Sequence, residues 1–323
     1  MTIQAEQKPD VRKIIGAILT CSLVIILPAI EWSLFGWLHM LLPLLAFLVL
    51  GKYGGYTGKR FLLTALALAA IVLTLLNSFD LFIFSAVFLL SGYVLFTSTE
   101  RQDTIAICGL KTCVTLAVGW TIILGFFTFG AEISPYNQLL QTLDQGIGEA
   151  LTYYRQSDTV SGDTMIVLET TLYQMKVLVP IIMPAILGSI ILLVTWFTMV
   201  IGNNLLLKIN GASPWVSYGY WSLPDKLIWL VIITALASLV PVQSLKFIGI
   251  NGIILLSIIY AFQGLAVAVF YMNKWSVPIL LRSFFYVMMI LQSFGTIVLI
   301  ILGIADIWFD FRKLKQQIVN EEK

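Results

Sequence analysis

His39 is the only histidine of the chain, and it lies inside an apolar run eight residues after Glu31. As a pair, these two side chains could relay a proton at membrane depth, where ionisable residues often have functional roles. The alternative is a carboxylate at the level of the lipid headgroups and a histidine that hydrogen-bonds a neighbouring helix. A helix break at Trp32-Ser33 separates the two residues and favours this alternative.

Asn251 and Gln263 both lie within a later apolar run, residues 250–271. With Glu31 and His39 they make up our set of candidate residues for a polar cavity. Amides inside membrane helices more often join neighbouring helices by hydrogen bonds, and this is the alternative interpretation.

Asp306 and Asp310 are four residues apart, one turn of a helix, and Arg312 follows closely. The simplest interpretation is a charged helix end at the cytoplasmic interface, with Trp308 and Phe309 in the aromatic belt of the membrane. The pattern is too weak to predict a metal site.

The chain lacks the GxSxG, HExxH and CxxC motifs. A single histidine excludes multi-histidine metal sites and offers little for a catalytic triad. Cys108 and Cys113 are five residues apart and would point about 140° from each other on a helix, so we expect free buried thiols. We therefore predict no enzymatic activity and no cofactor. A lipid-modifying enzyme is the least favoured alternative, since no nucleophile or acid/base pair is visible.

The composition predicts an integral membrane protein. The chain has 323 residues, of which 59% are hydrophobic and 11% are charged, with a mean hydropathy of +0.95. Soluble domains carry about 25% charged residues. We expect an all-α polytopic transmembrane bundle of about 8–10 membrane helices, with two amphipathic helices outside the membrane. Its main partner would be the lipid bilayer, and nucleic acid is not expected.

For residues 1–130 the sequence predicts an N-terminal membrane bundle of five spans. Basic residues precede the first span, and the loop 51–60 carries three more, so the N-terminus is expected in the cytoplasm. The glycines of that loop favour a turn, although their spacing also fits close helix packing. The expected spans are residues 14–29, 34–50, 61–76, 81–96 and 105–130.

Residues 131–176 form the one long polar segment. Ser134-Pro135 is a helix-start signal, and apolar residues then recur at steps of three and four in two stretches. The segment has few lysines and arginines, which places it outside the cytoplasm. We predict two extracytoplasmic amphipathic helices, the second of which continues into a span with Pro180 and Pro184.

For residues 177–315 the sequence predicts a C-terminal membrane bundle, and for residues 316–323 it predicts a polar tail. Nine spans from a cytoplasmic N-terminus would put the tail outside, whereas Arg312, Lys313 and Lys315 argue that it is inside. Either residues 276–305 fold back as two short helices near Ser293-Phe-Gly295, or an earlier short span is re-entrant. We predict a cytoplasmic C-terminus.

Three segments carry a resemblance: Trp221-Ser-Leu-Pro-Asp225, Tyr260-Ala-Phe-Gln-Gly-Leu-Ala266 after Asn251, and Gly303-Ile-Ala-Asp-Ile-Trp-Phe-Asp-Phe-Arg312. They resemble the YybS-like family of bacterial multi-pass membrane proteins, which has no known activity. The resemblance implies a bacterial plasma (inner) membrane. More loosely, the first six spans, with Pro43 before the glycine turn, are similar to the substrate-binding subunits of energy-coupling-factor transporters and to the shape-determining protein MreD. This likeness concerns the fold alone.

Two functions are consistent with these patterns. The chain could bind or transport a small molecule without an energy source of its own, with the outer helices capping a cavity. Alternatively, it could be a non-enzymatic scaffold or regulator of envelope processes whose outer helices dock a partner membrane protein through their apolar stripes.

Overall fold

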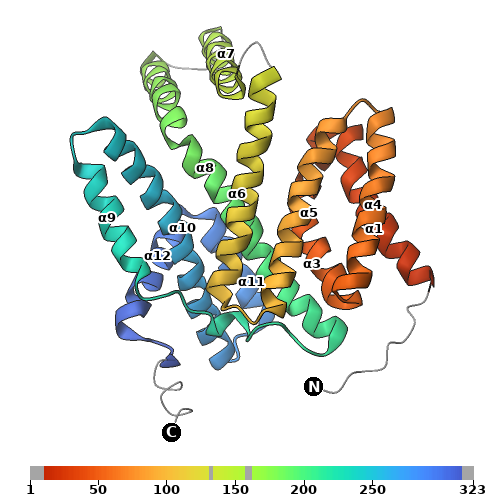
Figure 1. Ribbon diagram of the computed structural model, residues 1–323. Coiled ribbons are helices and arrows are strands. Elements are labelled where there is room, and N and C mark those ends of the chain that lie inside the picture. The colour runs from red at the N-terminus through yellow and green to blue at the C-terminus, as the bar shows by residue number, and fades with distance from the viewer. Residues whose placement is uncertain (1–10, 131–133, 157–161, 315–323) are drawn as a thin grey trace. The chain divides into compact units, whose positions relative to one another are not determined.

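The computed structural model describes residues 11–130, 134–156 and 162–314, and every regular element in these ranges is a helix (Figure 1). The predicted all-α class is therefore confirmed. The elements are α1 (Val11–Ile30), α2 (Trp32–Phe35), η1 (Gly36–Leu41), α3 (Leu42–Tyr53), α4 (Gly55–Leu75), α5 (Phe79–Glu100), α6 (Ile105–Gly130), α7 (Pro135–Arg155), α8 (Gly162–Asn210), η2 (Tyr218–Tyr220), α9 (Leu227–Leu239), α10 (Gln243–Lys274), α11 (Ile279–Leu291) and α12 (Ser293–Phe309).

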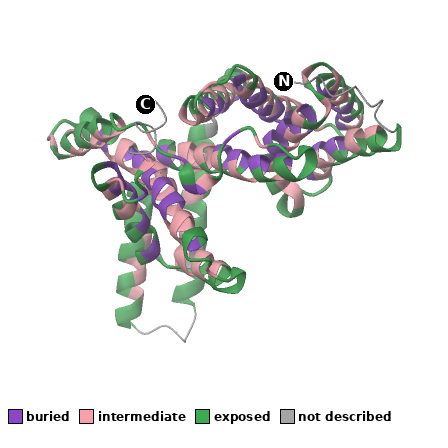
Figure 2. Cartoon of the chain, turned by 90° about the horizontal axis from the view of Figure 1, so that it is seen from below, coloured by how far each residue is buried: buried purple, intermediate pink, exposed green. Residues whose placement is uncertain are grey.

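Among the described residues, seven helices are long and apolar enough to cross a membrane, and the bent pair α11–α12 would make an eighth. The apolar helix α9 is shorter, with 13 residues. Buried residues gather on the inner sides of the helices, while exposed residues cover their outer faces (Figure 2). Many of the exposed side chains are large and apolar, such as Leu75 and Ile122. This is the arrangement expected for a protein whose outer surface faces lipid.

Contacts divide the chain into two compact units. Unit 1 comprises Met1–Trp120, Ile191–Pro224 and Ala261–Lys323, and unit 2 comprises Thr121–Ile190 and Asp225–Tyr260. The helices α6, α8 and α10 contribute residues to both units, so these groupings differ from the predicted ranges 131–176 and 177–315. The predicted tail 316–323 lies outside the described residues.

In unit 1, glycines explain the sharp return between α3 and α4. Gly54 has φ +79°, a conformation that ends α3 and that L-residues with side chains rarely adopt. Four residues later, a Cβ at Gly58 would lie 2.9 Å from the Leu50 Cα atom. The two interpretations of this loop therefore apply to different glycines: Gly54 makes the turn, and Gly58 allows close packing of α3 and α4.

The helices α4 and α5 are longer than predicted, with 21 and 22 residues instead of 16. At 1.5 Å per residue they measure about 32 and 33 Å, enough for a hydrocarbon core of about 30 Å. The predicted short spans were wrong because polar residues such as Lys59 and Thr99 continue the helices beyond the apolar runs. The turn between α4 and α5 therefore need not dip into the membrane.

Several loops of unit 1 meet at one end of the unit. The Asn210 side chain, at the end of α8, donates to the Gly51 carbonyl at 2.9 Å. The rings of Trp215 and Phe47 stack with centroids 5.7 Å apart. At the same end, the Tyr271 hydroxyl donates to the Phe311 carbonyl at 2.8 Å, which joins the last turn of α10 to the end of α12.

The helices α11 and α12 form a pair with a bend of 101° between them, which fits either one broken span or the predicted folded-back pair. The break comes at Gln292, within one residue of the predicted turn. The Tyr271–Phe311 hydrogen bond holds the end of α12 near the end of α10. If the bent pair enters and leaves the membrane on one side, the conflict over the side of the tail needs no earlier re-entrant span.

In unit 2, α7 and the first part of α8 are the two predicted amphipathic helices. The Ser134 hydroxyl caps α7 by accepting the Asn137 amide, as the sequence predicts. Two ion pairs join the helices, Arg155–Glu169 at 2.6 Å and Lys176–Asp144 at 3.1 Å. As expected, α8 then continues without a break through its two prolines, and it runs on to Asn210.

Candidate functional site

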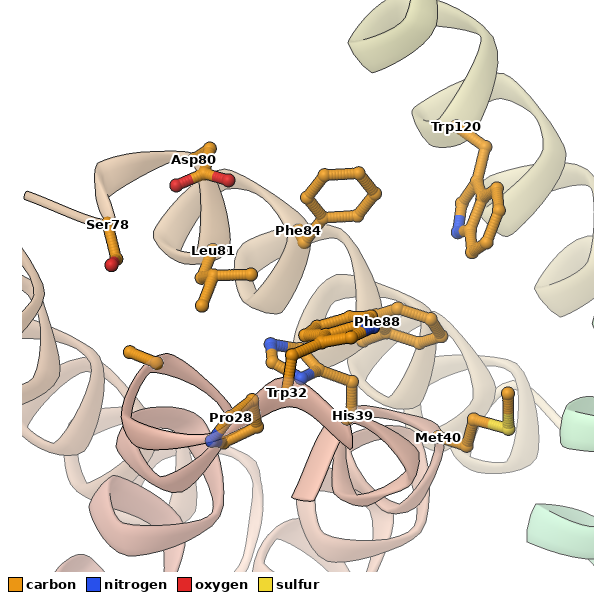
Figure 3. Close-up of a pocket in the computed structure, with 12 residues that line it drawn as sticks. Pro28, Trp32, His39, Met40, Ser78, Asp80, Leu81, Phe84, Phe88 and Trp120 are labelled. Atoms are coloured by element: carbon orange, nitrogen blue, oxygen red, sulfur yellow. The ribbon is translucent and has the colours of Figure 1, made fainter. Parts of the chain in front are cut away.

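The strongest candidate site is a cavity of about 610 Å³ around His39 in unit 1, which we call the His39 cavity (Figure 3). Its walls come from the end of α1, from α2 and η1, from the start of α5 and from α6. It is lined by Pro28, Ala29, Trp32, Gly36, His39, Met40, Ser78, Asp80, Leu81, Phe84, Phe88 and Trp120. A volume of this size is within the range of small-molecule sites, about 300–1,000 Å³.

The hydrogen bonds of Ser85 indicate a tautomer for His39, which is only 3% exposed. The Ser85 hydroxyl donates its one proton to the Leu81 carbonyl at 2.8 Å. With its proton on that bond, the hydroxyl accepts from His39 Nε2, which lies 3.0 Å away. In the neutral imidazole the other nitrogen, Nδ1, is then an acceptor. This atom is buried and has no hydrogen-bond partner among the described residues.

Aromatic rings form most of the wall. His39 lies between Trp32 and Phe88, with ring centroids 5.7 and 6.3 Å away. Trp120 comes from α6 and meets Phe84 and Phe88 edge-on, with centroids 6.1 Å away in each case. Figure 3 shows the indole directed toward these two rings. Its Nε1–H is buried and has no hydrogen-bond acceptor in the described part of the chain.

The charge at the mouth of the cavity is negative. Asp80 lies in the first turn of α5, is exposed, and forms no ion pair with another described residue. A carboxylate there is favoured by the helix dipole. The cavity wall contains no lysine or arginine. Sequence reasoning missed Asp80 and Trp120, because neither belongs to a motif and their helices meet only in three dimensions.

Of the four predicted cavity residues, His39 is in this wall and Glu31 is not. The Glu31 carboxylate instead accepts the Ser33 amide at 3.2 Å and so caps α2. Since Glu31 and His39 have different partners, their geometry lends no support to a proton relay. It agrees with the alternative for His39, a hydrogen bond to a neighbouring helix.

Asn251 bonds two backbone groups of α8, another helix of unit 2, near Pro184. Its Oδ1 accepts the Ala185 amide at 2.8 Å, and its Nδ2 donates to the Ile181 carbonyl at 2.9 Å. In a regular helix these two backbone groups would bond each other. The amide of Asn251 is therefore inserted into the hydrogen-bond ladder of α8 next to Pro184, where proline disturbs the helix. This is the role of an amide that joins helices.

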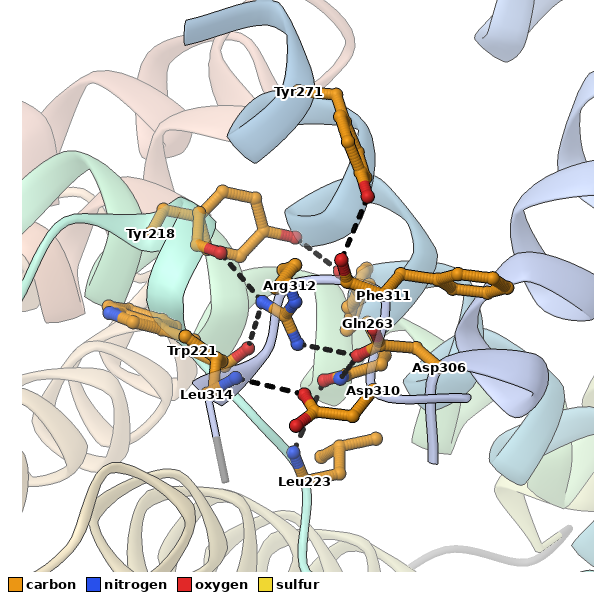
Figure 4. Close-up of polar contacts among 12 residues, drawn as sticks. Tyr218, Trp221, Leu223, Gln263, Tyr271, Asp306, Asp310, Phe311, Arg312 and Leu314 are labelled. Carbon is orange, nitrogen blue, oxygen red and sulfur yellow. Dashed lines mark hydrogen bonds and ion pairs between the residues drawn. The ribbon is translucent and has the colours of Figure 1, made fainter. Parts of the chain in front are cut away.

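Gln263 belongs to a buried polar cluster at the loop-rich end of unit 1 (Figure 4). It donates to Asp306 Oδ2 at 2.8 Å and accepts the Leu223 amide at 3.2 Å. Asp306 Oδ2 also accepts from Arg312 at 2.7 Å. The side chains of this ion pair are 5% and 1% exposed, so it is desolvated. Like Asn251, Gln263 uses its amide to join separate segments.

Arg312 also holds the loop 211–226 by donating to the carbonyls of Gly219 at 2.6 Å and Trp221 at 2.8 Å. Asp310 has φ +40° and caps the tail by accepting the Leu314 amide. The predicted Asp306, Asp310 and Arg312 motif therefore forms one structure, but a buried one. The sequence interpretation of a charged interfacial helix end was wrong for Asp306 and Arg312, because the loop covers both side chains.

The same loop carries further buried polar groups. Asn203 holds it by pairing with both backbone groups of Trp215, at 3.0 and 3.1 Å. The Tyr218 hydroxyl donates to the Phe262 carbonyl at 2.6 Å. Burial raises the pKa of Tyr218 above its ordinary value of 10.0, so this tyrosine keeps its proton. The loop is thus fixed by hydrogen bonds rather than free to bind a ligand.

A second cavity, of about 760 Å³, lies along α10, α11 and α12 in unit 1. Its wall is almost entirely apolar, and the hydroxyl of Tyr271 in that wall is already bonded to Phe311. An apolar wall can hold hydrocarbon, but it lacks the few convergent polar groups that orient a specific ligand. No three histidine, cysteine or acidic residues in the described part of the chain are grouped to hold a metal ion.

Comparisons with known proteins address the family and not the activity. No curated protein and no solved structure matches the chain. A family model described as "Predicted membrane protein (DUF2232)" matches residues 17–307, which is most of the chain. This match agrees with the resemblance to an uncharacterised multi-pass membrane family. The chain therefore belongs to the DUF2232 family of predicted membrane proteins.

Proposed function

We propose that this membrane protein binds a small molecule in the His39 cavity, either to carry it across the membrane or to present it to a partner. The observation that carries this proposal is a cavity of about 610 Å³ whose aromatic wall holds two buried polar atoms without partners, His39 Nδ1 and Trp120 Nε1. Buried polar groups in native proteins are nearly always hydrogen-bonded, so an unpaired acceptor and donor in one cavity are suited to a ligand.

We further propose a bacterial plasma membrane with both termini in the cytoplasm. The loop-rich end of unit 1 carries most of its basic residues, among them Lys52, Arg60, Arg101, Lys274 and Lys313, and cytoplasmic loops are enriched in such residues. With this orientation the turn between α4 and α5 is extracytoplasmic, and so is the mouth of the His39 cavity beside Asp80. Labelling of Gln156→Cys and Lys313→Cys in a cysteine-free background tests this. An impermeant maleimide should label residue 156 alone from outside.

The chain carries no recognisable nucleotide-binding motif, and transport would use an ion gradient or a partner subunit. We propose no enzymatic activity, because the polar side chains of the cavity comprise one imidazole, one indole, one exposed carboxylate and the Ser78 hydroxyl, which donates to the Leu76 carbonyl. None of these groups is paired as nucleophile and base.

The test of binding is native mass spectrometry of the protein purified from its own membrane. Ala29→Trp should fill the cavity, since Ala29 lies in its wall. Leu75→Trp adds the same side chain on the lipid-facing side of α4, where Leu75 is 77% exposed. We expect a bound molecule in the wild type and in Leu75→Trp, and its loss in Ala29→Trp. Equal loading of all three proteins would contradict the proposal.

A scaffold or regulator is the second candidate, and a specific observation favours it. Along α7 and the start of α8, most of the predicted stripe residues are half-buried, although Tyr136, Tyr154 and Met175 are exposed. Other large apolar side chains are exposed as well, including Tyr153 (71%), Ile166 (65%) and Tyr173 (69%). Such side chains outside a membrane span suit a partner protein. Cross-linking from Tyr173→p-benzoylphenylalanine in cells should capture a defined partner if this function holds.

A further inference from the structure

We propose that the ligand of the His39 cavity carries a protonated amine. This inference rests on the proposed binding function and assigns the chemical class of the molecule. It follows from three properties of the wall: its charge, its aromatic faces and its free acceptor.

The charge of the wall favours a cation. Asp80 is the one charged residue among those that line the cavity, and it has no ion-pair partner among the described residues. The wall offers no basic side chain to a carboxylate or phosphate. An anion entering this cavity would meet the like charge of Asp80, which is unfavourable.

The aromatic wall favours the same sign. Trp32, Phe84, Phe88 and Trp120 surround the space with rings, whose faces are negative. A cation within about 6 Å of such a face is attracted to it, most strongly to tryptophan.

The free acceptor distinguishes an amine from a quaternary ammonium group. His39 Nδ1 is left as an unpaired acceptor by the chain of bonds from Nε2 to Ser85 and on to the Leu81 carbonyl. A protonated primary amine presents N–H donors, one of which can serve this nitrogen, while its positive charge is favoured by the Asp80 carboxylate in the same wall. A trimethylated nitrogen has no N–H and would leave Nδ1 unpaired, at a cost.

The experiment measures binding of three matched probes to the purified protein in nanodiscs of phosphatidylglycerol. The probes are phenethylammonium, its N-trimethyl derivative and neutral 2-phenylethanol. We expect phenethylammonium to bind at least tenfold more tightly than the alcohol and more tightly than the trimethyl cation. Asp80→Asn should weaken the binding of phenethylammonium by about fivefold and leave that of the alcohol unchanged.

Glu31→Gln is the control, because it removes a nearby carboxylate that caps α2 outside the cavity wall. It should leave all three affinities unchanged. A second set of nanodiscs containing phosphatidylethanolamine separates two sources of the amine. Weaker binding of phenethylammonium there assigns the site to a lipid headgroup, and unchanged binding assigns it to a free amine. Both results support the protonated-amine class.

Equal affinities for the ammonium and the alcohol, or an unaltered ammonium affinity in Asp80→Asn, would overturn this inference. The proposed function would still stand if Ala29→Trp lost its co-purified molecule. If no probe binds and Ala29→Trp carries the same load as the wild type, both proposals fail.

Discussion

The buried ion pair of Asp306 and Arg312 allows the sharpest prediction about stability. Arg312 is 2% exposed and donates to one carboxylate oxygen and to two backbone carbonyls of the loop 211–226. Replacing Arg312 by methionine keeps most of the side-chain volume but leaves Asp306 as a buried charge. Replacing Asp306 by asparagine keeps the shape but leaves the guanidinium without its counter-charge.

The expected cost follows from desolvation. Removing one partner of a buried pair costs about 3–5 kcal/mol, because the remaining charge is uncompensated. Each single variant should therefore lower the free energy of unfolding by about that amount. The double variant leaves no buried charge, so it should cost about as much as one single variant instead of the sum. Its residual cost comes from the carbonyls of Gly219 and Trp221, which lose their donor.

The assay is unfolding in mixed micelles titrated with SDS, followed by circular dichroism. Lys313→Met is the matched control, since it removes the neighbouring cation from an exposed position and should change stability by less than about 0.5 kcal/mol. If the two single costs add to within about 0.5 kcal/mol in the double variant, the residues are independent and our interpretation of the cluster is refuted.

Three further perturbations test other parts of the fold. Asn251→Ala should destabilise the protein by about 1–3 kcal/mol, because it leaves an amide and a carbonyl of α8 unpaired. Asn210→Ala, at an exposed position, should have little effect, and unfolding in SDS compares the two variants. Gly58→Val should lower the free energy of unfolding by at least about 1–3 kcal/mol, because it overpacks α3 against α4. At Gly16 a Cβ meets nothing within 4 Å, so Gly16→Val should lower it by less than about 1 kcal/mol. Equal melting temperatures for the two variants would count against close packing at Gly58. Hydrogen bonds from the Lys111 and Ser98 side chains hold the pKa of Asp103 below its ordinary value of 3.8. The stabilising effect of the ionised carboxylate should therefore be complete above pH 3.8 and disappear as the pH falls through the lowered pKa. The melting temperatures of the wild type and Asp103→Asn should differ at pH 6 and converge in strong acid.

The sequence by itself determined the membrane class, the helical architecture and several local features. Composition excluded a soluble protein, because so apolar a surface cannot stay in water. The cap of α7 at Ser134 and the break between α11 and α12 beside Ser293 could also be predicted from the sequence. Such signals act within about four residues of the chain, and the sequence displays them directly.

The ends of the helices and the surroundings of the charged residues were harder to predict from the sequence. The apolar runs underestimated the lengths of α4 and α5, because a membrane helix continues into the headgroup region with polar residues. The chemistry of Asp306 and Arg312 suggested an interface, yet the loop 211–226 buries them. Arg312 reaches carbonyls that are 91 and 93 residues away in sequence, and a backbone acceptor leaves no signature in the residue type.

Only the tertiary structure decided the candidate site. His39 was visible as a lone histidine, but its partner Ser85 is 46 residues away, and the cavity needs walls from α1, η1, α5 and α6 together. In a membrane an apolar side chain is satisfied equally by lipid or by another helix, so hydrophobicity does not specify which faces meet. Close packing and interhelical hydrogen bonds make that choice. They act between residues far apart in the chain, so the cavity could not be predicted from the sequence.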